Sequence, residues 1–191
     1  SLLSLSSDNV NQGFYDAATL LEIQMQRADE YAKNPDGLRG LPSGLKTMDS
    51  LLGGFQKSDL IILAARPSVG KSALSFDIAR HIATNVKKTV AIFSLEMPAV
   101  QVIERMLAQQ TRINLWSLRM GKLKDDEYSR YNEGAAKLAE SKIFIDDTPG
   151  ISIMQLRSRA RRLMIEHSLD IILIDYLQLM QGNLKQTDNR A

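Results

Sequence analysis

The stretch from Leu60 to Ser72 (LIILAARPSVGKS) constrains the fold more than any other part of this sequence. It opens with an apolar run without alternation, which is typical of a strand buried on both faces of a parallel sheet. Pro67 and a later glycine then interrupt regular structure, and apolar residues at helical spacing follow from Ala73 onward. The Gly-Lys-Ser triplet at 70–72 is therefore predicted to begin a helix, where free backbone N–H groups and the helix dipole attract phosphate.

Residues 65–72 match the phosphate-binding pattern G-x-x-x-x-G-K-[ST], except that Ala65 replaces the first glycine. Because of this departure, the pattern by itself indicates phosphate binding only in general terms, and a second feature is needed. The residues predicted to surround the phosphates of a nucleotide are Arg66, Pro67, Ser68, Val69, Gly70, Lys71 and Ser72.

The second feature lies at Asp170–Asp175 (DIILID), where consecutive aliphatic residues end in an acid. The run predicts a buried strand whose carboxyl end presents Asp175 at the edge of a parallel sheet. In nucleotide sites Mg²⁺ takes oxygen ligands from the serine of the phosphate loop and from such an acid. Ser72 and Asp175 are therefore predicted to hold Mg²⁺ beside a bound nucleotide.

Two further strands are predicted at Thr89–Ser94 and Lys142–Asp146, with helical patterns between the strands. This order indicates an α/β domain with a mainly parallel central sheet flanked by helices. The first of these strands leads into Glu96, which should lie at the same sheet edge as Lys71, because ligands bind at the carboxyl ends of parallel strands. Glu96 is a candidate catalytic residue; the alternative is a charge that complements the dipole of the following helix.

Composition excludes several other kinds of site. The chain of 191 residues has no cysteine and 2 histidines, so we expect neither disulfides nor a thiolate or histidine metal site. Its apolar runs are far shorter than the roughly 20 residues that span a bilayer, and we expect a cytoplasmic protein with no membrane partner. A net charge of +2 does not by itself indicate nucleic acid.

The N-terminal part differs from the rest of the chain. Residues 1–13 are predicted to be a flexible lead-in, 14–37 an amphipathic helix with its connector, and 38–191 the α/β domain. In the helix, apolar residues recur at spacings of three and four from Ala17 to Ala32. Such a stripe packs either on its own domain or on a neighbouring subunit, and the pattern alone does not choose between these two.

Two other patterns also have competing interpretations. Trp116 is predicted to pack in the core rather than to stack on a nucleic-acid base. The helix predicted from Ser152 to Glu166 bears arginines that cannot share one narrow face, which favours a solvated, ion-paired helix over one that contacts DNA. These arginines are Arg157, Arg159, Arg161 and Arg162.

Taken together, the motifs resemble those of the DnaB-type replicative DNA helicases, specifically their C-terminal RecA-like motor domain. The resemblance is carried by LPSGLKTMDSLLGGFQKSDLIILAARPSVGKS at 41–72, SLEM at 94–97, IDDTP at 145–149, LRSRARRL at 156–163 and IDYLQLM at 174–180. The family tolerates alanine at the first position of the phosphate loop, which accounts for Ala65. The resemblance covers nearly everything from residue 14 onward.

The resemblance implies a role for each candidate residue. Lys71 would contact the β- and γ-phosphates of ATP, and Ser72 would bind Mg²⁺. Glu96 would polarise the attacking water, and Asp175 would be the second acid near the metal ion. The implied fold is a RecA-like P-loop domain, preceded by a linker helix that packs against the adjacent subunit of a ring.

The implied function is that of an ATP-driven helicase motor, which translocates on single-stranded DNA and unwinds the duplex as a hexameric ring. Primase and a helicase loader are the partners that the family implies. One alternative is a RadA- or recombinase-like ATPase of DNA repair, and another is a nucleotide-binding module that assembles a ring without useful turnover.

The end of the sequence, 181–191, corresponds to the point where the family enters a DNA-facing loop. Lys185 and Arg190 are candidate DNA contacts there, and a solvated tail is the alternative. The family's sensor strand, which lies between the strand before Lys71 and the strand that ends at Asp175, comes later, as does its arginine finger. We therefore expect an ATPase domain that is incomplete at its C-terminal end and that alone is weakly active or inactive.

Overall fold

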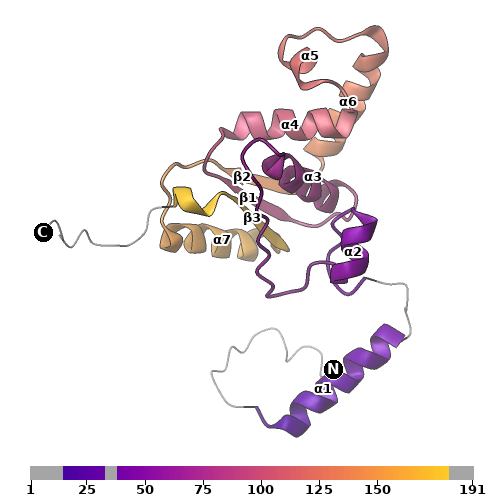
Figure 1. Cartoon of the computed structure of the whole chain (residues 1–191), viewed down its shortest axis with the longest axis vertical. Helices are drawn as coiled ribbons and strands as arrows, with labels where there is room; N and C mark the ends of the chain where they lie inside the picture. The colour runs from indigo at the N-terminus through magenta and orange to yellow at the C-terminus, as the bar shows by residue number, and fades with distance from the viewer. Residues whose placement is uncertain (1–14, 33–37, 181–191) are drawn as a thin grey trace, which may run out of the picture. The chain divides into compact units, whose positions relative to one another are not determined.

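The computed structural model describes residues 15–32 and 38–180. The chain divides into two units, Ser1–Arg39 and Gly40–Ala191. Within the described residues, no helix combines the length and hydrophobicity that crossing a membrane requires. The elements in chain order are α1 (Ala17–Ala32), α2 (Lys46–Leu52), α3 (Lys71–Thr84), β1 (Val90–Ser94), α4 (Ala99–Thr111), α5 (Leu115–Arg119), α6 (Asp125–Ala139), β2 (Ile143–Asp146), α7 (Ile153–His167), β3 (Ile171–Asp175) and the short 3-10 helix η1 (Leu177–Leu179) (Figure 1).

The first unit contains the helix that the apolar spacing predicts. Before α1, the Asp16 carboxylate accepts hydrogen bonds from the backbone N–H and the hydroxyl of Thr19, at 2.9 and 2.6 Å. The apolar side chains of α1 are open to solvent, with Leu21 61% and Met25 68% exposed. Within the first unit, no described residue covers this apolar stripe. The flexible lead-in predicted for 1–13 lies outside the described residues.

The second unit is built on a parallel sheet of three described strands in the order β2-β1-β3 (Figure 1). The central strand β1 pairs with both neighbours in one register, so that Val90 lies opposite Ile143 on one side and Ile171 on the other. Helices lie on both faces of the sheet, as the core contacts show. The predicted α/β class and the predicted parallel sheet flanked by helices are confirmed.

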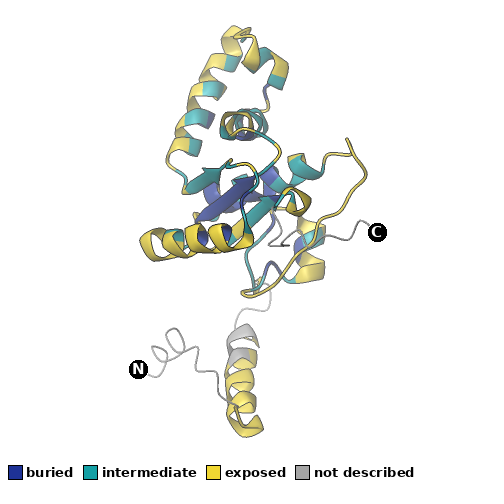
Figure 2. Cartoon of the chain, turned by 90° about the vertical axis from the view of Figure 1, so that its left-hand side faces the viewer, coloured by how far each residue is buried: buried dark blue, intermediate teal, exposed yellow. Residues whose placement is uncertain are grey.

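Alternate residues of β1 enter two separate layers of the core. Val90 and Ile92 pack with the buried side chains of α3 and α4, whereas Ala91 and Phe93 pack with those of α7. Every residue of β1 is buried, and Figure 2 shows the middle strand of the sheet in dark blue. An aliphatic run without alternation suits this position because both faces of the strand are covered by helices. Burial of its side chains contributes about 25 cal/mol per Å² of apolar surface.

The prediction of a buried strand at 60–64 is wrong. The backbone there has no regular structure, and the apolar side chains are exposed, Leu60 by 84% and Ile62 by 74%. A strand is stable only when its N–H and C=O groups pair with a neighbouring strand. None of the three described strands pairs with this segment. Its aliphatic composition suits a strand, but composition cannot supply the pairing partner.

The prediction that Trp116 packs in the core is also wrong, because the side chain is 57% exposed. Trp116 belongs to α5, a helix of 5 residues with no buried member. A helix this short has too few turns to bury a whole face. Lys122 covers the ring instead, with its Nζ 5.4 Å from the ring centroid.

Helix α7 agrees with the prediction of a solvated, ion-paired helix. It begins after Ser152, whose side chain and that of Gln155 cap each other's backbone N–H groups. Arg162 pairs with Glu166 one turn further on, at 2.8 Å, and Arg159 pairs with Asp146 at the end of β2. At least two of the arginines therefore have partners within the protein.

Helices α4 and α6 meet closely at Gly134. A Cβ built on Gly134 would lie 2.4 Å from Cγ2 of Thr111. The Thr111 side chain cannot easily turn away, because it is buried and its hydroxyl donates to the Leu107 carbonyl at 2.7 Å. The contact therefore requires a residue without a side chain in the middle of a helix.

We expect Gly134→Ala to lower the free energy of unfolding by about 1–3 kcal/mol through overpacking. Helix propensity alone would instead raise the free energy of unfolding, because it favours alanine over glycine by about 1 kcal/mol. Adding Thr111→Ser should recover much of the loss, because serine lacks the methyl group and keeps the hydroxyl. Urea unfolding of the single and double variants measures both effects. A Gly134→Ala variant as stable as the parent would contradict the close contact.

Candidate functional site

The phosphate loop leads into α3, which begins at Lys71. Gly70 precedes the helix with a φ of 106°, in the left-handed region that favours glycine. Residues 66–70 are exposed, and the first amides of α3 have no carbonyl partner within the helix. These N–H groups can therefore donate to an anion at the positive end of the helix dipole.

Lys71 and Asp175 are brought into direct contact across the site. Lys71 Nζ lies 3.1 Å from Asp175 Oδ1, and the side chain of Asp175 is only 4% exposed. The lysine comes from the first turn of α3 and the aspartate from the last residue of β3. A buried carboxylate is costly without a cation, so Lys71 compensates the charge of Asp175.

The oxygen donors at this end of the sheet suit Mg²⁺. Asp175 Oδ2 is buried and has no hydrogen-bond partner, which leaves one lone-pair donor unused beside the phosphate loop. Ser72 follows Lys71 and adds a hydroxyl oxygen in the first turn of α3. Among the described residues, no group of three or more His, Cys, Asp and Glu side chains could hold a metal ion. The two oxygens therefore fit an ion whose other ligands come from a nucleotide and water.

Glu96 lies at the same edge of the sheet as Asp175. Ser94 is the last residue of β1, and it pairs in register with Asp175 of β3. Glu96 follows two residues later in the turn before α4, where it is exposed. The Ser94 hydroxyl donates to the Met97 carbonyl at 2.7 Å and thereby closes this turn. Glu96 therefore follows the end of β1 that lies beside Asp175.

Sequence reasoning missed two residues at this edge. The Tyr176 ring lies 4.3 Å from Lys71 Nζ and adds a cation–π contact to the lysine. Asp147 accepts a hydrogen bond from the backbone N–H of Ala99 at the start of α4. Both stand inside the motifs IDYLQLM and IDDTP, but neither contact follows from spacing along the chain. The predicted DNA contacts, Lys185 and Arg190, lie outside the described residues.

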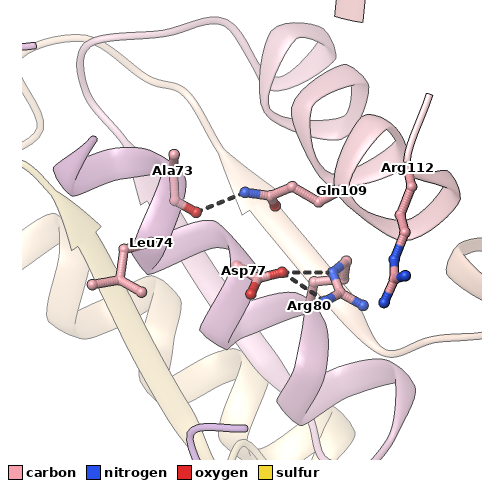
Figure 3. A pocket seen from close by; sticks show the side chains of 6 residues that line it. All are labelled: Ala73, Leu74, Asp77, Arg80, Gln109 and Arg112. Carbon is pink, nitrogen blue, oxygen red and sulfur yellow. Dashed lines mark hydrogen bonds and ion pairs between the residues drawn. The ribbon is translucent and has the colours of Figure 1, made fainter. Parts of the chain in front are cut away.

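A hollow beside α3 is lined in part by residues that attach α4 to α3, and none of its lining residues is a predicted site residue (Figure 3). Gln109 of α4 donates to the Ala73 carbonyl at 2.8 Å, and Arg80 donates to Gln110 at 2.6 Å. Arg80 also pairs with Asp77 one turn earlier on α3. These contacts fasten α4 to the helix that carries Lys71. The residues that line the hollow are Ala73, Leu74, Asp77, Arg80, Gln109 and Arg112.

Comparison with known proteins gives one consistent result. Residues 40–191 match the family model described as "DnaB-like helicase C terminal domain". The chain is 47% identical over 153 residues to the replicative DNA helicase DnaC of Bacillus subtilis (strain 168), covering 80% of this chain and 34% of that protein. It is 46% identical over 172 residues to the replicative DNA helicase DnaB of Geobacillus stearothermophilus, covering 88% of this chain and 38% of that protein. The chain thus spans less than half the length of these relatives.

Two solved structures share its fold. The ATPase domain of G40P aligns with a TM-score of 0.81 at 26% identity, over 92% of this chain and 62% of that chain. A DnaB-like replicative helicase, from a structure concerned with its interactions with primase, aligns with a TM-score of 0.78 at 24% identity. That alignment covers 99% of this chain and 45% of the other. The fold is therefore that of a RecA-like helicase ATPase domain.

We expect Lys71→Met to lower the free energy of unfolding of the nucleotide-free protein by about 1–3 kcal/mol, because Asp175 is left buried without its partner. Adding Asp175→Asn should recover part of this loss by removing the uncompensated charge. Lys88→Met is the matched control, since Lys88 is 47% exposed and pairs with Asp170 at 3.4 Å. The control should cost less than about 1 kcal/mol. Equal losses in urea unfolding of the two lysine variants would contradict a buried role for the Lys71 pair.

Proposed function

Because the chain belongs to the DnaB-like helicase C-terminal domain family, we propose that it is the motor domain of an ATP-dependent replicative DNA helicase. The observation that carries the proposal is the contact of Lys71 with Asp175, which joins the phosphate loop to the acidic end of β3. Glu96 stands at the same edge through the register of β1 with β3. Together these groups supply a cation for phosphate, an acid for a metal ion and an acid for water.

Each group has one role in the proposed site. The backbone of residues 66–72 and the Lys71 ammonium hold the phosphates of ATP. Ser72 and Asp175 hold Mg²⁺, which neutralises charge on the phosphates when it is bound. Glu96 orients the attacking water and accepts its proton. Lys71 must then exchange Asp175 for a phosphate oxygen, so that binding of the nucleotide rearranges the ion pair seen in this structure.

The proposal extends to partners and location. Single-stranded DNA is the track, and the active form is a homo-oligomer, a hexameric ring assembled through α1. Support for this role of α1 comes from its exposed apolar stripe, in which Leu21 and Met25 are both more than half exposed. Such a stripe favours docking on a neighbouring subunit over exposure to water. Primase and a helicase loader are proposed as partners from family membership, and the cytoplasm as the location.

The DNA task separates this proposal from the other functions compatible with a RecA-like site. In the full-length protein, we expect single-stranded DNA to stimulate ATP hydrolysis and the protein to displace a strand from a forked duplex. A recombinase-like ATPase would instead exchange strands between homologous duplexes. A ring-assembly module would bind ATP, yet DNA would not change its hydrolysis. Absence of both DNA-stimulated hydrolysis and strand displacement would contradict the helicase assignment.

We expect Glu96→Gln in the full-length protein to bind ATP with near-parental affinity and to hydrolyse it about 10²- to 10⁴-fold more slowly, because the amide cannot accept a proton from water. Lys71→Ala should lose binding and hydrolysis together. Glu104→Gln is the matched control, since Glu104 on α4 pairs with Arg119 at 2.9 Å. Steady-state turnover and equilibrium binding of ATP measure these effects. Unchanged hydrolysis by Glu96→Gln would remove Glu96 from the mechanism.

A further inference from the structure

The turn that carries Glu96 is fixed at its start by β3. The backbone N–H of Leu95 donates to the carbonyl of Asp175 at 2.8 Å, which extends the pairing of β1 with β3 by one residue. The Ser94 hydroxyl then reaches forward to the Met97 carbonyl at 2.7 Å. The position at which the chain leaves the sheet is therefore set, but these bonds do not fix the direction in which it continues into α4.

The start of α4 is capped by a residue from the loop that follows β2. Pro98 occupies the N-cap position and has no side chain that can accept a hydrogen bond. Asp147, 48 residues further along the chain, accepts the N–H of Ala99 with Oδ2 at 2.8 Å. A carboxylate at this place satisfies one unpaired amide and complements the helix dipole. The cap therefore ties the start of α4 to the exit from β2.

The loop that holds Asp147 is itself anchored. Asp146, the last residue of β2, accepts a hydrogen bond from Arg159 of α7, and Arg159 also donates to the Thr148 hydroxyl at 2.7 Å. Partial burial raises the pKa of Asp146, but hydrogen bonds from Arg159 and Thr148 outweigh that effect and hold the pKa below its ordinary value. Asp147 thus projects from a loop bound to α7 on either side of it.

The far end of α4 is also held. Gln109 donates to the Ala73 carbonyl (Figure 3), and Arg80 donates to Gln110. Ala73 directly follows the Gly-Lys-Ser triplet, so α4 is attached near the phosphate loop at one end and to Asp147 at the other. The turn with Glu96 lies just before the end held by Asp147. The cap therefore holds the start of α4 directly after the turn that carries Glu96.

We propose that Asp147 is a positioning residue that orients Glu96 for hydrolysis by capping α4 from the exit of β2. The inference rests on the proposed role of Glu96 and adds Asp147 to Glu96 and Asp175 as an acid that acts through Glu96. Asp147 accepts a backbone N–H of α4, so its contribution is geometric. A misplacement of about 1 Å at a reacting group costs on the order of 10²-fold in rate, which sets the size of the effect.

The test uses ATP turnover by the full-length protein. We expect Asp147→Ala to lower kcat about 10- to 100-fold while KM for ATP stays within about threefold, because the phosphate loop does not depend on the cap. Asp147→Asn should recover most of the rate, since its amide oxygen accepts the same N–H. If Asp147 had a purely structural role, Asp147→Ala would lower the unfolding midpoint, and kcat would not fall selectively while KM stayed the same.

Two further variants make the test specific. Glu127→Ala removes another capping carboxylate, the one that accepts the N–H of Lys124 before α6 at 3.0 Å, and it should leave kcat unchanged. In the double variant Glu96→Gln with Asp147→Ala, the rate should equal that of Glu96→Gln alone, because residues that act as one unit are not additive. A multiplied loss in the double variant would show that Asp147 acts independently of Glu96 and would overturn the proposal.

The remaining outcomes separate this inference from the proposed function. If Glu96→Gln impairs hydrolysis but Asp147→Ala does not, the positioning role alone is overturned. An equal loss of kcat in Glu127→Ala also overturns it, because any loss of a helix cap would then suffice. Normal hydrolysis by Glu96→Gln overturns both the role of Glu96 and the inference that depends on it.

Discussion

The parallel pairing of β1 with both of its neighbours is the constraint on which the site depends. Its backbone hydrogen bonds place Phe93 opposite Asp146 and Ser94 opposite Asp175, so that three strands end at one level. An acidic residue stands at or within two residues of the end of each strand: Glu96 after β1, Asp146 in β2 and Asp175 in β3. Because the register cannot slip without turning every buried side chain to the wrong face, the core that packs against β1 also determines the spacing of these acids.

Charge compensation at this edge links stability to ligand binding. The Lys71 ammonium is shared between the Asp175 carboxylate and the Tyr176 ring. A phosphate group would compete for the lysine, and a cation would compete for the carboxylate. The two exchanges favour each other, because the phosphate replaces Asp175 as the partner of Lys71 and the cation replaces Lys71 as the partner of Asp175. In the proposed function, a metal nucleotide would therefore replace this ion pair without leaving a charge uncompensated.

Helix α4 connects the helix that carries Lys71 to the loop after β2. It is fastened to α3 through Gln109 and to the exit of β2 through Asp147, and the turn with Glu96 precedes it. The contact at Gly134 adds α6 to the same assembly. A helix held at several points along its length behaves as a rigid spacer, so contacts with other elements control the position of the turn that carries Glu96.

The sequence by itself determined the class of the fold, the strands that end at Ser94, Asp146 and Asp175, and the helix that begins at Lys71, because these depend on local apolar runs and on residues that break them. Only the tertiary structure decided that residues 60–64 form no strand, since pairing requires a neighbour that composition cannot provide. It likewise decided that α4 is capped by Asp147, because that contact joins residues 48 apart and leaves no periodic signal in the chain.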